Sequence, residues 1–246
     1  MEIFLIVFGL IASVLLGGGL VSILQRSENE QLIKLMLAFS GGFLLSIAFI
    51  HFIPELYEHT ELNIGVFILI GFLIQLILEF FSGGIEHGHM HLHKNAKLPV
   101  GMILALCIHS FLEGIPLGNQ LAGIEIATAH HHDNDHTLFF GILFHRIPVA
   151  IALMTLLYTA GIGWLKSWWI LGIFAITTPL GLLIGFNSMN LTYLNAFDFN
   201  IILAIVVGMF LHISTTIIFE TSENHKFNFL KLITIFIGCS IAFLMH

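Results

Sequence analysis

The stretch LPVGMILALCIHSFLEGIPLGNQL, from Leu98 to Leu121, decides the fold class of this chain. It is long and apolar enough to cross a bilayer, which takes about 20 residues at a rise of about 1.5 Å each. Near its middle, His109 and Glu113 stand four residues apart, so a helix places both side chains on one face. An ionisable group at membrane depth costs on the order of 3 kcal/mol. The pair therefore needs a compensating partner, and a divalent metal ion suits an imidazole together with a carboxylate.

The composition of the whole chain also indicates a membrane protein. The 246 residues are 57% hydrophobic and 9% charged, whereas a soluble domain has about 25% charged residues. No basic patch is present, so no nucleic-acid partner is expected. The chain has fifteen histidines but only eight lysines and arginines, and histidine is the commonest metal ligand.

The cysteines and the N-terminus predict no disulfide and no cleaved signal. Cys107 and Cys239 lie in apolar runs, so we expect no disulfide. Glu2 stands where a cleavable signal would have a basic region, so none is expected.

Apolar segments follow one another along the chain and predict an all-α integral membrane protein. A single domain, residues 1–246, is expected to hold eight transmembrane helices joined by short loops. The segments cover residues 3–24, 32–54, 64–81, 99–121, 137–159, 165–187, 199–219 and 229–246.

The basic residues predict how these segments are oriented. The first, third, fifth and seventh loops contain or border every lysine and arginine except Arg146. The second, fourth and sixth loops have none and carry acidic residues instead. Under the positive-inside rule the odd-numbered loops are cytoplasmic, so both termini are expected to face outward.

Two loops are rich in histidine, and both are expected to capture metal ions weakly rather than to form one fixed site. The third loop, residues 82–98, is expected in the cytoplasm, and the fourth loop, residues 122–136, outside. The candidate ligands in the third loop are His87, His89, His91 and His93. Those in the fourth loop are His130, His131, His132, Asp133, Asp135 and His136. A polar linker is the alternative interpretation of the third loop.

Other polar residues stand near the ends of segments. His51 and Glu55 are again four residues apart, and they predict either a metal-attracting pair at the outer mouth or an interfacial histidine beside a solvated carboxylate. His212 is a candidate entrance or exit position, with a hydrogen-bonded packing histidine as the alternative. Asn190 begins a glycosylation sequence in an expected outer loop.

The fifth segment places a second polar group at membrane depth, with His145 beside Arg146 and Pro148 shortly after. A proline lacks a backbone donor and leaves the carbonyl four residues earlier without its helical partner. Pro116 has the same effect in the fourth segment. Two adjacent helices that combine prolines with polar side chains predict a shared transport site near the membrane midplane.

These residues resemble a known family. HSFLEGIPLG in the fourth segment and HRIPVAIAL in the fifth resemble the paired metal-site helices of the ZIP (ZRT/IRT-like) divalent-metal transporters. HFIPE in the second segment, the His-rich third loop and TPLG in the sixth segment fit the same family, so the resemblance covers essentially the whole chain.

The resemblance implies an eight-helix bundle with outward termini and a metal site between the fourth and fifth transmembrane helices. It also implies import of zinc into the cytosol, in some members of iron(II), manganese or cadmium, and homodimers in many members. We expect the plasma membrane, with an organelle membrane as the alternative.

Carried over to this sequence, the resemblance assigns the primary metal site to His109, Glu113 and His145. The second-site or neighbouring positions, where many members have amides or carboxylates, are here Ser110, Arg146, Val149 and Thr178. Val149 and Thr178 each stand where a glutamate is found in family members, and Arg146 adds a permanent positive charge. These departures predict one metal ion rather than two, and we expect Arg146 to pair with Glu113 or a neighbour when the ion has left.

The chemistry of this ligand set suits transport. Two imidazoles and one carboxylate leave one position open for water, as in reactive or exchangeable zinc sites. An intramembrane zinc-dependent hydrolase is one alternative, but the chain has no HExxH motif and no second carboxylate placed as a general base, so we expect no enzyme. A transport-inactive metal sensor is the other alternative, because Val149 removes an expected ligand.

Overall fold

The computed structural model describes residues 2–24, 30–59, 63–82, 100–123, 136–188, 199–219 and 229–245. Within these ranges, every regular element is a helix. The elements are α1 (Glu2–Leu24), α2 (Glu30–Ile47), the π-helix η1 (Ala48–Phe52), α3 (Ile53–His59), α4 (Ile64–Ser82), α5 (Val100–Leu121), α6 (Thr137–Thr159), α7 (Trp164–Phe186), α8 (Phe199–Phe219) and α9 (Phe229–Leu244).

The predicted all-α membrane fold is confirmed, since each of the eight apolar segments forms a helix. In the described part of the chain, seven helical stretches are long and apolar enough to cross a membrane, and one of them joins α2, η1 and α3 into a single span, Gln31–Glu58. Helix α9 is apolar but shorter, with 16 residues. Apolar segments of this length form helices because lipid offers no partner for an unpaired backbone N–H or C=O group.

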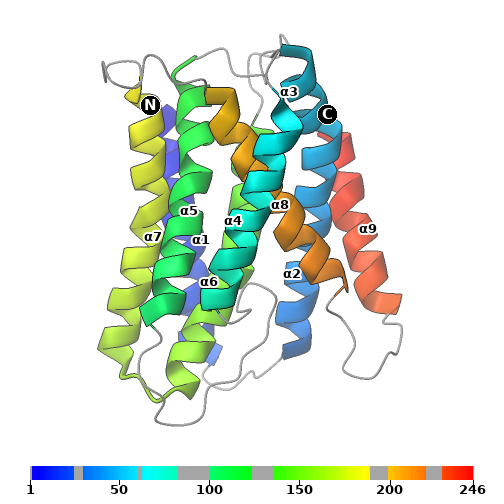
Figure 1. The fold of residues 1–246 in the computed structure, drawn as a ribbon. Coiled ribbons are helices and arrows are strands. Elements are labelled where there is room, and N and C mark those ends of the chain that lie inside the picture. Colours follow the sequence, from blue (N-terminus) through cyan, green and yellow to red (C-terminus); the bar gives the residue numbers. More distant parts are fainter. Residues whose placement is uncertain are drawn as a thin grey trace.

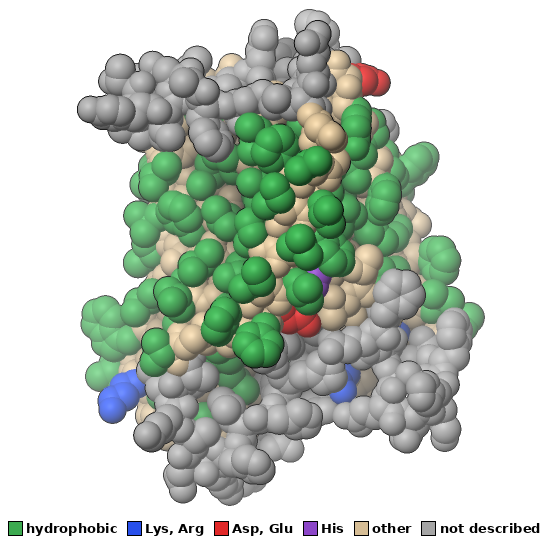
Figure 2. Space-filling model, viewed as in Figure 1, with side chains coloured by type: hydrophobic (Ala, Val, Ile, Leu, Met, Phe, Trp, Pro, Cys, Tyr) green, Lys and Arg blue, Asp and Glu red, His purple; other side chains and the backbone are tan. Residues whose placement is uncertain are grey.

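The helices form one bundle with two groups (Figure 1). Helices α1, α5, α6 and α7 pack together on one side, and α2, α4, α8 and α9 on the other. Contacts of α6 with α2, and of α5 with α4 and α8, join the groups. The first and last helices place the two chain ends at the same end of the bundle. Hydrophobic side chains cover the middle of the face shown in Figure 2, as a surface in contact with lipid requires.

In three pairs of helices, glycines on both partners lie against the backbone of the other helix. At each of these glycines, an added Cβ atom would overlap a carbonyl oxygen of the facing helix. The glycines are Gly114 and Gly118 opposite Gly181 and Gly185 between α5 and α7, Gly71 opposite Gly208 between α4 and α8, and Gly42 opposite Gly238 between α2 and α9. Helices in lipid associate mainly through close packing, so these small residues determine which helices pair.

The prolines change the helices less than the sequence suggested. Pro116, Pro148 and Pro179 lie inside α5, α6 and α7, and each helix continues through its proline. The predicted interruptions in the fourth and fifth segments are therefore limited to one missing backbone donor in each helix.

The second segment departs from an α-helix where His51 lies. In η1, the N–H of Ile53 donates to the carbonyl oxygen of Ala48, five residues earlier. Pro54, which has no N–H to donate, follows directly. The helix around His51 is therefore wider than an α-helix, and the pairing of His51 with Glu55 stays a prediction.

The glycine contacts predict that Gly181→Ala destabilises the protein while Gly172→Ala on the same helix does not. A Cβ at Gly181 would meet the carbonyl of Phe111, whereas nothing lies within 4 Å of a Cβ at Gly172. Forcing an extra methyl into a packed contact costs about 1–3 kcal/mol, whereas alanine at an open helical position is favourable by about 1 kcal/mol. Thermal unfolding in detergent micelles measures both. Equal melting temperatures for the two variants would contradict this role of the glycines.

Candidate metal site

Three ionisable side chains meet in the interior of the bundle. His109 and Glu113 lie one turn apart on α5, and His145 reaches them from α6. The Nε2 atom of His109 is 2.8 Å from Oε1 of Glu113, and the ring centroids of the two histidines are 6.0 Å apart. All three residues are buried, with exposed fractions of 2%, 0% and 2%. The i, i+4 spacing in α5 thus places the pair on one face, as predicted.

The geometry fits a tetrahedral divalent ion. One ligand atom from each of the three residues lies within 4.8 Å of the others. Neighbouring ligand atoms around a zinc ion, with bonds of about 2.0–2.1 Å, are about 3.3 Å apart. Small side-chain rotations would therefore bring all three atoms to bonding distance. Among the described residues, this is the one group of three or more histidine, cysteine and acidic side chains with such a geometry.

Arg146 directly follows His145 on α6 and contacts the neighbouring helix α7. Its guanidinium Nη2 donates to the carbonyl oxygens of Phe174 at 3.2 Å and Ala175 at 3.4 Å. The guanidinium carbon lies over the Phe174 ring, 5.0 Å from the ring centroid. Pro179 explains why an acceptor is present, because it has no N–H to offer the carbonyl of Ala175 four residues earlier. The prediction was that Arg146 pairs with Glu113 or a neighbour; its hydrogen bonds go to neighbouring carbonyls of α7, and its charge and that of Glu113 attract one another.

The three remaining positions beside the group lack a carboxylate. The Thr178 hydroxyl on α7 donates to the carbonyl oxygen of Ser110 on α5, at 2.7 Å, so it connects the two helices that the glycines bring together. Val149 follows His145 by one turn of α6 and is buried in an apolar cluster with Val14 and Leu153. Its side chain forms part of a hydrophobic wall and offers no ligand atom.

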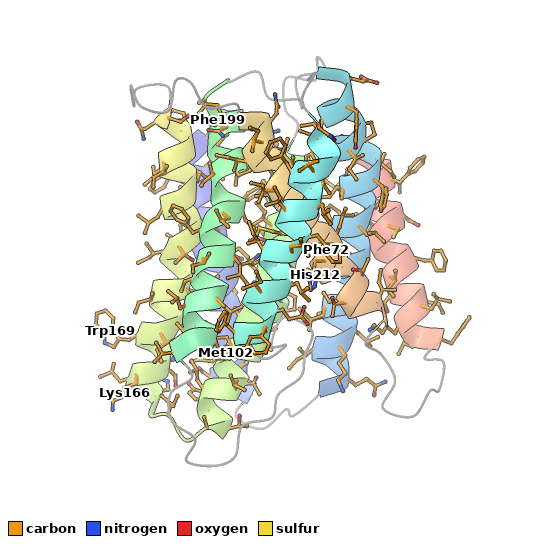
Figure 3. All side chains as sticks on the ribbon, in the orientation of Figure 1. Phe72, Met102, Lys166, Trp169, Phe199 and His212 are labelled. Carbon is orange, nitrogen blue, oxygen red and sulfur yellow. The ribbon has the colours of Figure 1, made fainter. Side chains whose placement is uncertain are left out.

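His212 has a partner that sequence reasoning missed. Its Nδ1 atom on α8 lies 3.3 Å from Oε2 of Glu79 on α4. The Phe72 ring packs against the imidazole, with centroids 4.7 Å apart, and Figure 3 shows the two side by side. The sequence does show that Glu79 is a carboxylate inside an apolar segment, and such a group needs a partner. It does not show that this partner is His212, because the two residues are far apart along the chain.

The other predicted positions are separate from this group. His51 is buried in η1, and Glu55 is half-buried in α3. His136 precedes α6, and its Nε2 is 4.0 Å from Oε1 of Glu2, with both side chains partly exposed. The residues His87, His89, His91, His93, His130, His131, His132, Asp133, Asp135 and Asn190 lie outside the described residues.

The fold and the site define a helical membrane protein with a buried group of side chains that could hold a metal ion. A family model described as "ZIP Zinc transporter" matches residues 91–246, more than half of the chain. The chain therefore belongs to the ZIP family, in agreement with the resemblance found in its motifs. A curated relative, Protein zntD of Dictyostelium discoideum, is 26% identical over 164 residues, which cover 61% of this chain and 22% of that protein. The chain thus matches well under half the length of this relative.

The geometry predicts that Glu113→Gln weakens zinc binding while Glu79→Gln leaves it nearly unchanged. Glutamine keeps the shape of the side chain but removes the negative charge from the group of three. Groups that only support the ligands change metal affinity by about 10–100-fold, so loss of a ligand should cost at least that much. Isothermal titration of purified protein whose loop histidines are replaced by asparagine would isolate the buried site. Equal zinc affinities for the two variants would contradict the assignment of Glu113 as a ligand.

Proposed function

We propose that the protein transports divalent metal ions, zinc above all, across a membrane into the cytosol. Its single-ion site is formed by His109, Glu113 and His145. The observation that carries this proposal is a buried cluster of two imidazoles and one carboxylate, between two helices of a ZIP-family chain. Such groups are expensive in a bilayer and mark ion pathways. Iron(II), manganese and cadmium are further substrates that this ligand set can bind.

A single ion fits the surroundings of the cluster. A second metal ion would need further carboxylates, and the neighbouring positions carry Val149, Thr178 and Arg146 instead. The guanidinium is charged at all physiological pH values and repels a second cation. Among the described residues, the group contains no fourth histidine, cysteine, aspartate or glutamate, which supports the sequence-based prediction of one ion.

Three ligands also suit release of the ion. A closed four-ligand site releases zinc too slowly for transport, whereas three protein ligands leave a position for exchange. Both histidines must be neutral to bind, so zinc binding releases protons and affinity falls as the pH drops through the range where imidazole is protonated.

The topology that we propose has eight spans and outward termini. Lys166, which borders the fifth loop, lies at the end of the bundle opposite the two chain ends (Figures 1 and 3). This placement agrees with a cytosolic fifth loop under the positive-inside rule. In this topology His212 and Glu79 lie in the cytosolic halves of α8 and α4, where they can receive the departing ion. His51, Glu55 and His136 lie toward the outer ends of their segments.

The cellular context follows the same proposal. We place the protein in the plasma membrane, with the same inward direction if it lies in an organelle membrane, and propose that it can form homodimers. Membership of a transporter family favours transport over the two alternatives, an intramembrane hydrolase and a transport-inactive sensor. The histidine-rich loops, residues 82–98 and 122–136, would then capture zinc on the two sides of the membrane.

Uptake into proteoliposomes tests the proposed transport. Wild-type protein should give saturable zinc uptake, with smaller rates for iron(II), manganese and cadmium. His109→Ala should reduce zinc uptake by at least about 100-fold, because removal of one ligand leaves a two-ligand site in lipid. His136→Ala, in the outer loop, serves as the matched control and should retain most of the flux. Zinc binding without flux in the wild type would instead support the sensor.

Cysteine labelling tests the proposed orientation. In a background with Cys107 and Cys239 replaced, Asn63→Cys should react with an impermeant maleimide from outside intact cells. Gly163→Cys, in the fifth loop, should react only after the membrane is opened. Both positions are exposed in the structure. The reverse labelling pattern would show that the topology is inverted.

A further inference from the structure

The ligand set of the site does not by itself decide which ions are carried. The inference below names those ions and rests on the proposed function. Two imidazoles and one carboxylate hold iron(II) when three further coordination positions are open, and zinc when one is open. Manganese also prefers six ligands, whereas zinc has a filled d shell and accepts four. The space around the three ligands therefore decides between these ions.

Two apolar side chains cover the ligands on one side. Val149 follows His145 by four residues on α6, and Leu106 precedes His109 by three residues on α5. Residues three or four apart lie on the same face of a helix. Both side chains are buried and belong to one hydrophobic cluster, which also contains Ile213 of α8. Since α5 and α6 are consecutive spans that run in opposite directions, both side chains lie toward the end that we assign to the cytosol.

A second hydrophobic cluster covers the ligands on the other side. Ile142 precedes His145 by three residues, and Leu117 follows Glu113 by four. Both are buried, and both belong to a cluster that also contains Ile47 of α2. The ligands therefore lie between two apolar layers, and their own side chains are at most 2% exposed.

The neighbouring polar groups leave further coordination positions to water. The Thr178 hydroxyl donates to the Ser110 carbonyl, and the guanidinium of Arg146 has no lone pair with which to bind a cation. In the part of the chain that the structure describes, no fourth histidine, cysteine or acidic residue joins the group. A buried water needs two to four polar partners, and the side chains of Val149 and Leu106 offer none. These surroundings favour one bound water over three.

We propose that Val149 determines which ions the site accepts. Its buried side chain, together with Leu106, keeps the bound ion four-coordinate by excluding further waters. Zinc and cadmium, both with filled d shells, are accepted on this account, and iron(II) and manganese, which take six ligands, are disfavoured. The competing view is that Val149 only packs the hydrophobic cluster and has no effect on the choice of ion.

Cobalt(II) bound to the otherwise native full chain, with asparagine in place of the loop histidines, tests the coordination number. Cobalt(II) can replace zinc, and it absorbs visible light strongly when four-coordinate and only weakly when six-coordinate. The account predicts the strong absorption, and its loss in His109→Ala. A weak, six-coordinate spectrum would overturn the proposal. This measurement needs no change at Val149.

Competition between zinc and manganese for the same protein tests the role of Val149. Val149→Ala removes two methyl groups one turn from His145 and admits water. Manganese affinity relative to zinc should then rise by at least about tenfold, the scale on which the surroundings of a site alter metal affinity, and the cobalt absorption should weaken. Val149→Thr keeps the side-chain volume and adds a hydroxyl group that can bind water. It should shift the ratio in the same direction, which keeps the test valid if Val149→Ala does not fold.

Leu157→Ala is the matched control. Leu157 is buried in the same hydrophobic cluster on α6, but it lies three turns beyond His145. This variant loosens the cluster without opening the site, so the ratio of manganese to zinc affinity should stay within about twofold of wild type.

The contradicting outcomes separate this inference from the proposed function. Equal shifts of the affinity ratio in Val149→Ala and Leu157→Ala would overturn the role of Val149, because any loosening of the cluster would then suffice. An unchanged ratio in both Val149 variants would also overturn it. In either case, zinc uptake that still depends on His109 would leave transport intact. Zinc binding that does not depend on His109 would overturn both proposals.

Discussion

The rest of the structure depends on how the charged groups of α5 and α6 are accommodated at membrane depth. Glu113 and Arg146 are 0% and 1% exposed, and each would cost on the order of 3 kcal/mol if it entered lipid alone. In the fold, the charges of Glu113 and Arg146 attract one another. Two imidazoles lie beside Glu113, and Arg146 donates hydrogen bonds to carbonyl oxygens of α7. These interactions lower the cost of burying the charged groups in the membrane. The same arrangement of side chains also creates a place for a cation.

Close packing of α5 on α7 makes this arrangement possible. The glycines of the two helices let backbone meet backbone, which brings Thr178 within hydrogen-bond distance of the Ser110 carbonyl. The same helix α7 presents the carbonyl that Pro179 leaves open, and Arg146 uses it. A glycine contact, a proline and a buried arginine therefore act as one unit, although they lie on three different helices. The first of these features is a packing requirement of helices in lipid.

Much of this could be predicted from the sequence, because hydrophobic length and helical spacing are local properties. The eight segments, the shared face of His109 and Glu113, and the approach of His145 all follow from periodicity or from the family motifs. The contacts between distant helices could not be predicted. Nothing in the sequence near Arg146 shows that its guanidinium turns to Phe174 rather than to Glu113, and nothing near His212 shows that Glu79 faces it. The π-helical turn at His51 was also missed, since an i, i+4 argument assumes an unbroken α-helix.

X-ray absorption spectroscopy of bound zinc tests the central claim most directly. The protein would carry asparagine in place of the histidines of the two loops, so that only zinc at the buried site contributes to the spectrum. The account predicts one zinc ion per chain, with two imidazole nitrogens, one carboxylate oxygen and one further light atom at bonding distance. A protein that binds no zinc once the loop histidines are gone, or a spectrum without two imidazoles, would contradict the assignment of His109, Glu113 and His145 as the metal site.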